Sequence, residues 1–308
     1  MRPPAVLALD LGGTQLRTAL TLADGRVVAR QASRTPRNAA AIVARCILQL
    51  QSTREEALRE GAGQPVAIGI SAPGPLDAAT GTMLDPPNMD RSLWNFPLGP
   101  QISDALDLPF AIGLDVHVAA LGEGEFGAAM GLTDYIYLTV STGVGGAVVT
   151  GGRLMLGADG LAGELGHLLV DIDGPVCGCG AHGHLEAISS GTGIARAARE
   201  AGLGEIDARQ VAALEETGNL AAAEIMGRAR SAFAEAVVTM VDVFNPQRIV
   251  VGGSIAGGQG DRLLGPARSA VRDHAYRRQA ERVEIVPTAL GDDVGLIGAL
   301  SLVNRTNN

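Results

Sequence analysis

The chain has 308 residues, of which 46% are hydrophobic and 19% charged, a balance that suits a folded globular protein and excludes a disordered one. Its formal net charge of −9 argues against a nucleic-acid partner, because binding phosphates requires a basic surface. No apolar run reaches the roughly 20 residues of a membrane span and no signal-peptide pattern opens the chain, so we expect a cytoplasmic protein without membrane contact.

The N-terminal third predicts an α/β unit. Residues 5–13, 16–24 and 26–33 have the composition of strands, and an Asp-Gly turn at residues 24–25 joins the last two. A long helix over about residues 38–60 and a strand over residues 65–70 follow. A helix near residues 98–107 then leads into a short strand at 110–114, and the next helix begins at Asp115.

The same order of elements then starts again. Residues 134–157 predict strand, glycine turn, strand and strand, followed by helices near 186–202 and 219–244. A strand at 248–253, a helix from about 258, a strand at 282–287 and a closing helix from Val294 complete the chain. We therefore expect two α/β domains with a ligand-binding cleft between them. The expected domains are residues 1–113, completed by the helix at 294–308, and residues 114–293.

Glycine-rich turns follow three of the predicted strands. Each would be an ordinary hairpin turn on its own, and none matches the Rossmann or P-loop nucleotide patterns. Glycine, however, lets backbone N–H groups approach phosphate oxygens closely, so three turns distributed over both halves could cradle a nucleoside triphosphate. The residues expected at the nucleotide are Asp10, Gly12, Gly13, Thr14, Thr142, Gly143, Gly252 and Gly253.

One short segment gathers side chains that bind metals. Residues 163–186, GELGHLLVDIDGPVCGCGAHGHLE, contain two of the three cysteines and three of the five histidines. Two cysteines one residue apart favour a metal over a disulfide, and mixed sulfur and imidazole ligands suit tetrahedral zinc. Four protein ligands leave no open position for a reactive water, so such a site is structural. The remaining cysteine, Cys46, lies in a predicted helix and is interpreted as a core residue.

These segments resemble those of the ROK family, which comprises ATP-dependent sugar kinases and sugar-responsive repressors with the actin/hexokinase-type fold. DLGGT at residues 10–14, STGVGG at 141–146 and VGGS at 251–254 carry the resemblance, which covers nearly the whole chain. The metal segment is most specific: the family pattern E-x-G-H, then C-x-C-G-x-x-G-C-x-E, fails at one position, where His184 replaces a cysteine. The resemblance implies two ribonuclease-H-like domains, with ATP, Mg²⁺ and a structural Zn²⁺ as cofactors.

The resemblance also implies roles for the residues around the metal. The implied zinc ligands are His167, Cys177, Cys179 and His184. His182 is the alternative fourth ligand, and weak zinc binding stays open. The implied contacts to sugar hydroxyls are Asn88, Glu164, His167 and Glu186. Because Glu164 and Glu186 stand next to metal ligands, the zinc would brace the sugar pocket.

The expected catalytic base is Asp115, which matches the family's catalytic aspartate. Aspartate at a helix start is also a common N-cap, so this position has a purely structural interpretation as well. Asp10 would face Mg²⁺ through water while Asp115 orients and deprotonates the sugar hydroxyl. Two neighbours depart from the family: Leu114 and His117 stand where family kinases commonly have asparagine.

The sequence thus predicts an ATP-dependent hexose kinase that acts on the primary hydroxyl of glucose or an N-acetylhexosamine. The resemblance alone suggests a homo-oligomer. A sugar sensor with little or no catalysis is the alternative, but only nine residues precede Asp10, too few for the DNA-binding helix-turn-helix of the repressors. A zinc hydrolase is disfavoured because the metal would have no open position.

Overall fold

A computed structural model describes residues 5–87 and 89–306, so Asn88 lies outside the described residues. The chain divides into two compact units. Unit 1 takes the chain up to Met130 and again from Leu290 onward, and unit 2 is Gly131–Ala289. None of the helices in the described part combines the length and apolarity that crossing a membrane requires.

Unit 1 is built on a five-stranded sheet with the order β3-β2-β1-β4-β7. Its strands are β1 (Ala5–Leu11), β2 (Gln15–Leu22), β3 (Val27–Arg34), β4 (Pro65–Ala72) and β7 (Phe110–Leu114), with a separate ribbon of β5 (Leu76–Asp77) and β6 (Thr82–Met83). Its helices are α1 (Ala39–Arg59), η1 (Arg91–Leu93), α2 (Leu98–Leu106), α3 (Asp115–Phe126), η3 (Gly291–Asp293) and α11 (Val294–Thr306). The pairs β1–β2 and β2–β3 are antiparallel, whereas β1–β4 and β4–β7 are parallel.

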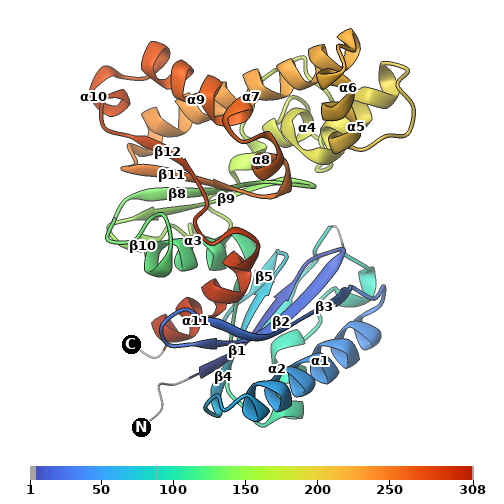
Figure 1. The fold of residues 1–308 in the computed structure, drawn as a ribbon, viewed down its shortest axis with the longest axis vertical. Helices are drawn as coiled ribbons and strands as arrows, with labels where there is room; N and C mark the ends of the chain where they lie inside the picture. The colour runs from blue at the N-terminus through green and yellow to red at the C-terminus, as the bar shows by residue number, and fades with distance from the viewer. Residues whose placement is uncertain (1–4, 88, 307–308) are drawn as a thin grey trace. The chain divides into compact units, whose positions relative to one another are not determined.

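Strand β1 is buried on both faces, which explains its unbroken apolar sequence. Leu7 and Leu9 pack with residues of α1 and α2, and Val6 and Ala8 pack with residues of α11. Because successive side chains of a strand point to opposite faces, this alternation places two helices on each side of the sheet. Figure 1 shows α1 and α2 on one face, and α3 and α11 on the other.

Unit 2 repeats this topology with a sheet of order β10-β9-β8-β11-β12. Its strands are β8 (Tyr135–Val140), β9 (Val144–Thr150), β10 (Arg153–Leu154), β11 (Arg248–Gly252) and β12 (Glu284–Pro287). Its helices are η2 (Leu165–His167), α4 (Leu185–Ser189), α5 (Gly191–Glu200), α6 (Ala208–Glu216), α7 (Leu220–Phe244), α8 (Ser254–Gln259), α9 (Asp261–His274) and α10 (Arg277–Ala280). The pairs β10–β9 and β9–β8 are antiparallel, whereas β8–β11 and β11–β12 are parallel.

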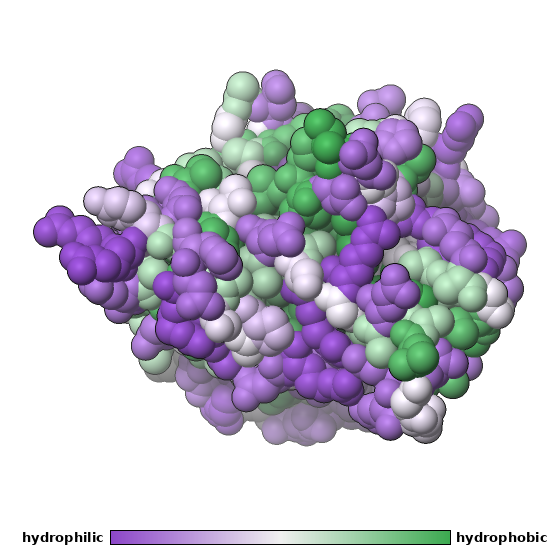
Figure 2. Space-filling model, turned by 90° about the horizontal axis from the view of Figure 1, so that it is seen from above, coloured by the Kyte–Doolittle hydropathy of each residue, from purple (hydrophilic) through white to green (hydrophobic). Residues whose placement is uncertain are grey.

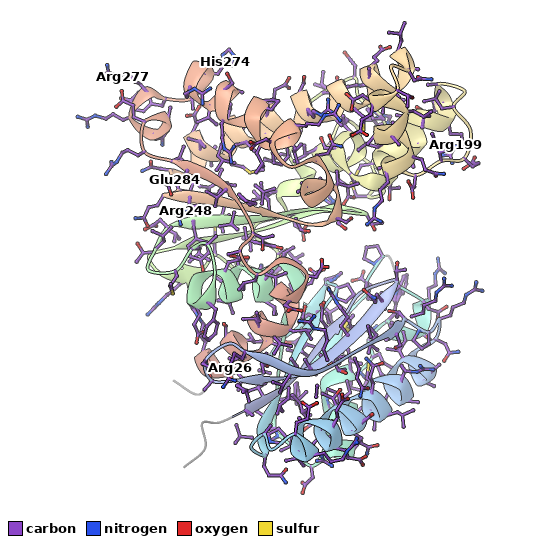
Figure 3. The ribbon with its side chains drawn as sticks, viewed as in Figure 1. Arg26, Arg199, Arg248, His274, Arg277 and Glu284 are labelled. Carbon is purple, nitrogen blue, oxygen red and sulfur yellow. The ribbon has the colours of Figure 1, made fainter. Side chains whose placement is uncertain are left out.

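One face of the unit 2 sheet is covered by α7 and α9, whose apolar side chains share a core with β8, β9, β11 and β12 (Figure 1). Arg248 of β11 and Glu284 on the edge strand β12 form an ion pair along this sheet (Figure 3). The outer helical surface of unit 2 is mainly hydrophilic, with hydrophobic residues in smaller patches between (Figure 2). This distribution is that of amphipathic helices packed on a sheet.

Two expected helices are interrupted in the structure. The helix expected near 186–202 breaks at Ser190, which has an extended backbone and caps α5 by accepting a hydrogen bond from Gly193. The helix expected from about 258 begins earlier, as α8, and breaks at Gly260, where φ is 51°. The sequence interpretation also missed α6, although a capping box of Asp207 and Gln210 marks its start.

The expected domain boundary at 113/114 separates α3 from unit 1, but the structure places α3 within it. Helices α3 and α11 pack closely: a Cβ atom on Gly298 would lie 2.0 Å from the carbonyl oxygen of Val118. The fully buried carboxylate of Glu123 accepts hydrogen bonds from the N–H of Ala128 at 2.6 Å and of Leu290 at 3.2 Å. These contacts join α3 to the returning C-terminal segment, which a boundary drawn from sequence patterns cannot reveal.

Candidate functional site

The carboxylate of Asp10, at the end of β1, is held by neighbours within unit 1. Its Oδ1 accepts a hydrogen bond from Ser71 at 3.0 Å, and its Oδ2 accepts bonds from Arg17 Nη2 at 2.6 Å and Nε at 3.1 Å. Asp10 is only 8% exposed. The guanidinium of Arg17 also donates to the carbonyl of Asp292 at 2.6 Å. Asp10 is therefore fixed in place, with both oxygens already accepting hydrogen bonds.

The first glycine turn, between β1 and β2, is fastened on one side and exposed at its tip. The N–H of Gly12 donates to the carbonyl of Gln15 at 2.9 Å. Thr35 donates its hydroxyl to the carbonyl of Gly12 at 2.6 Å and its N–H to that of Thr14 at 3.0 Å. Gly13 and Thr14 are exposed. The turn is thus a fixed loop whose tip is accessible to a ligand.

The second glycine turn, between β8 and β9, is held by the first turn of α5. The N–H of Gly191 donates to the carbonyl of Ser141 at 2.8 Å, and the N–H and hydroxyl of Thr192 donate to that of Thr142 at 3.1 and 2.9 Å. The hydroxyl groups of Ser141 and Ser254 lie 3.0 Å apart. Ser254 begins α8 directly after Gly253, so the structure brings the second and third glycine turns together.

Gly253 is required by the close packing of this third turn. Its φ is 94°, and an added Cβ atom would lie 2.4 Å from the carbonyl oxygen of Val140. Only glycine combines that backbone conformation with that approach. Gly252 precedes it at the end of β11, against Tyr137.

Glu186 connects the second glycine turn to the cysteine-rich segment. Its Oε2 accepts a hydrogen bond from the N–H of Val144 at 3.0 Å, and its Oε1 lies 3.7 Å from Cys177 Sγ, which donates to it. A Cβ atom on Gly143 would lie 2.5 Å from Oε2. The expected nucleotide residue Gly143 and the expected sugar residue Glu186 are therefore in contact with each other.

Four of the predicted metal ligands converge. The ligand atoms of His167, Cys177, Cys179 and His184 all lie within 4.8 Å of one another. Cys179 Sγ is 3.4 Å from His184 Nδ1, and the rings of His167 and His184 stack with centroids 5.0 Å apart. His182 does not belong to this group, and its Nδ1 lies 3.3 Å from the carbonyl of Gly174.

The chemistry of this group fits zinc. Tetrahedral Zn²⁺ with sulfur and nitrogen ligands needs donor atoms about 3.3–3.8 Å apart, so the group must contract by roughly 1 Å to close on an ion. Cys177 is 3% exposed, and burial raises the pKa of its thiol. Glu164 precedes η2 and is exposed, with its carbonyl accepting a bond from the His167 N–H at 3.0 Å.

Asp115 is the first residue of α3 rather than its N-cap, which is Leu114. It is exposed, and its Oδ1 accepts a hydrogen bond from the N–H of Val116 at 2.7 Å. Leu114 packs against the loop after β4, since a Cβ atom on Gly74 would lie 2.1 Å from Leu114 Cδ2. His117 is 7% exposed.

Sequence reasoning missed Arg17 and Ser71, the partners of Asp10. Arg17 lies directly opposite Asp10 in the β1–β2 register, and Ser71 opposite it in the β1–β4 register. The hairpin pattern gave a signal for the first pairing, because residues equidistant from a tight turn face each other. No comparable signal existed for Ser71, which is 61 residues away.

The chain matches known proteins over nearly its whole length. The model of the ROK family matches residues 6–306. A glucokinase from Thermotoga maritima is 32% identical, with 97% of each chain covered, and an N-acetylmannosamine kinase from Escherichia fergusonii is 34% identical, with 96% of this chain and 97% of the relative covered. The crystal structure of a ROK glucokinase from Streptomyces griseus with glucose and AMPPNP superimposes with a TM-score of 0.79 at 28% identity, covering 98% of this chain and 99% of the other.

Two repeated α/β units and these relatives together confirm the expected fold class, the actin/hexokinase-type fold of ROK kinases. They also confirm the resemblance that the glycine turns and the metal segment suggested. This chain belongs to the ROK family.

Proposed function

We propose that this protein is an ATP-dependent sugar kinase that phosphorylates the primary hydroxyl of a hexose, with glucose and N-acetylhexosamines as the leading acceptors. Full-length relatives named glucokinase and N-acetylmannosamine kinase support the activity class. The proposal rests on one observation in this protein: Glu186 contacts both the second glycine turn, through Val144, and the four-residue metal group, through Cys177. No comparable observation favours the sensor alternative.

In the proposed reaction Asp115 is the general base. Its carboxylate accepts the proton of the sugar's primary hydroxyl while that oxygen bonds to the γ-phosphorus of ATP, and the bond from this phosphorus to the β,γ-bridging oxygen breaks, releasing ADP. The position suits a base because Asp115 is exposed at the start of α3, so that its carboxylate is accessible to a substrate hydroxyl.

The glycine turns are proposed to hold the phosphates. Backbone N–H groups around Gly13 and Thr14 in unit 1, and around Thr142 in unit 2, are the proposed donors. Mg²⁺ would neutralise the phosphate charges. Because Arg17 and Ser71 already donate to Asp10, that carboxylate would reach the ion through a water molecule rather than directly.

The metal group is proposed to hold one structural Zn²⁺ through His167, Cys177, Cys179 and His184. When bound, the ion fixes the segment that carries Glu164 and Glu186, the proposed partners of sugar hydroxyls. A carboxylate accepts several charge-assisted hydrogen bonds, which suits recognition of a polyol. Asn88 is proposed as a further sugar contact from the sequence alone.

The proposed function is tested by incubating the protein with ATP, Mg²⁺ and a panel of hexoses while measuring ADP release. We expect ADP release with glucose or an N-acetylhexosamine, at a kcat in the ordinary range of about 1–100 s⁻¹ for kinases. Mass spectrometry of the product should find one added phosphate. Binding of the sugars by calorimetry without any ADP release would instead favour the sensor alternative.

Replacing Leu114 by asparagine is expected to raise kcat/KM for glucose. A leucine side chain cannot pair with a sugar hydroxyl, and an unpaired buried polar group costs about 1–3 kcal/mol, or roughly 5- to 150-fold in affinity. The variant is compared across the hexose panel with Leu48→Asn, which changes an exposed leucine on α1 and should alter nothing.

The response of the native sugar separates two explanations of Leu114. If Leu114 merely lacks a contact to a sugar hydroxyl, asparagine supplies that contact and improves turnover of every sugar that carries this hydroxyl. If it sets specificity, the same change lowers kcat/KM for the native sugar while raising it for glucose. An unchanged preference over the whole panel would show that residue 114 does not face the substrate.

A further inference from the structure

One arginine binds both ends of the metal-ligand segment. This segment, residues 176–187, carries Cys177, Cys179, His184 and Glu186. Arg196 of α5 donates from Nη1 to the carbonyl of Val176 at 2.5 Å and from Nη2 to the carbonyl of Ala187 at 2.6 Å. Val176 directly precedes the ligand Cys177, and Ala187 directly follows Glu186. The guanidinium therefore closes the segment into a loop without a metal.

The guanidinium is fixed and largely shielded from water. The side chain of Arg196 is 23% exposed, and its Nε lies 3.6 Å from Glu200 Oε1, one turn further along α5. A cavity of about 260 Å³ adjoins it, lined also by Pro175, Ile188 and Ile225. Two carbonyls at fixed positions demand two N–H groups in one plane, which arginine supplies and lysine does not.

The helix that carries Arg196 also carries the donors that hold the second glycine turn. Gly191 and Thr192, in the first turn of α5, donate to the carbonyls of Ser141 and Thr142. Helix α5 thus binds the proposed phosphate turn through its first residues and the metal-ligand segment through Arg196, five residues after its start. The distance between the turn and the segment is therefore set by α5, and Arg196 holds the segment at that distance.

We propose that Arg196 is a positioning residue for the sugar site: it holds the metal-ligand segment, and with it Glu186, against α5 at a fixed distance from the second glycine turn. This proposal rests on the proposed function for its effect on sugar affinity. The effect of Arg196 on the metal-ligand segment itself is independent of the proposed function, because the bonds to Val176 and Ala187 close the loop whatever ligand binds there.

The test compares Arg196→Met with Arg199→Met. Arg199 lies on the same helix, and its ion pair with Glu205 is at the surface, with 55% of the arginine side chain exposed (Figure 3). We expect Arg196→Met to transfer zinc to a chromophoric chelator roughly 10- to 100-fold faster and to raise the sugar KM by a similar factor. The KM for ATP and kcat should change much less. Arg199→Met should match the wild type in every measurement.

Hydrogen exchange supplies a readout that needs neither metal nor turnover. In zinc-free protein the amides of residues 176–187 should exchange faster in Arg196→Met than in the wild type, while those of α7 stay unchanged. If zinc release, sugar KM and exchange of this segment all match the Arg199→Met control, Arg196 does not position the segment and the proposal is wrong.

Chemical rescue distinguishes positioning from general damage to the fold. Arg196→Ala extends the neighbouring cavity to the two carbonyls, so guanidinium ion at low millimolar concentration can enter, far below the molar range that unfolds proteins. Guanidinium should slow zinc release again and lower the sugar KM, whereas ammonium should not. Equal effects of the two ions would contradict the proposal. If the wild type phosphorylates no sugar, the proposed function fails, but zinc release and exchange still decide the role of Arg196.

Discussion

Replacing Asp115 by asparagine is expected to lower kcat by roughly 10²- to 10⁴-fold while leaving the fold intact, because the amide cannot accept the proton of the sugar hydroxyl. The local structure should survive, because an amide oxygen can accept the hydrogen bond from the N–H of Val116 as Oδ1 of Asp115 does. Single-turnover kinetics measure the chemical step, and calorimetry without ATP should show unchanged sugar binding.

The matched control is Asp207→Asn. Asp207 also stands at a helix start, where it caps α6 by accepting a bond from the N–H of Gln210. This variant should keep wild-type kcat, because its aspartate has only the capping role. Near-normal turnover in Asp115→Asn would leave Asp115 with a structural role at the start of α3 and would remove the base from the proposed mechanism.

Replacing Cys177 by serine is expected to remove most of the bound zinc and to lower kcat/KM for the sugar by roughly tenfold or more. The serine hydroxyl is a poor zinc ligand, and the change also removes the thiol contact to Glu186 Oε1. Metal analysis of the purified wild type should give about one zinc per chain, as expected for a single four-ligand site. Wild-type protein with no zinc, and no response to chelators, would contradict the role of the metal.

Cys46→Ala is the control for this experiment. Cys46 is fully buried in α1 of unit 1, where burial raises the pKa of its thiol to about 12, and it does not belong to the four-residue metal group. Its replacement should leave zinc content unchanged. Burial also raises the pKa of Cys177, so zinc must displace a proton there. Zinc affinity should therefore fall as the pH is lowered, because protons and metal compete for the same thiolate.

The sequence by itself determined the repeated α/β plan and the segments of the candidate site. Both are local properties: a strand buried on two faces gives a run such as residues 5–11, and glycine turns and ligand spacings occupy consecutive positions. The metal group could be predicted for the same reason, since three of its four members lie within residues 177–184.

Only the tertiary structure decided which of these residues meet. His184 rather than His182 joins the metal group because the backbone pairs His184 with Leu169 and His182 with Val176, which fixes where each ring points. The contacts that place α3 in unit 1, the hydrogen bond from Ser71 to Asp10 and the contact of Gly143 with Glu186 link residues far apart in the chain. The bonds of Arg196 to both ends of the metal-ligand segment span only 20 and 9 residues, but they cross turns whose course no local pattern records. Such contacts depend on how helices and strands pack in three dimensions, and hydrophobic periodicity carries no information about that packing beyond which face is buried.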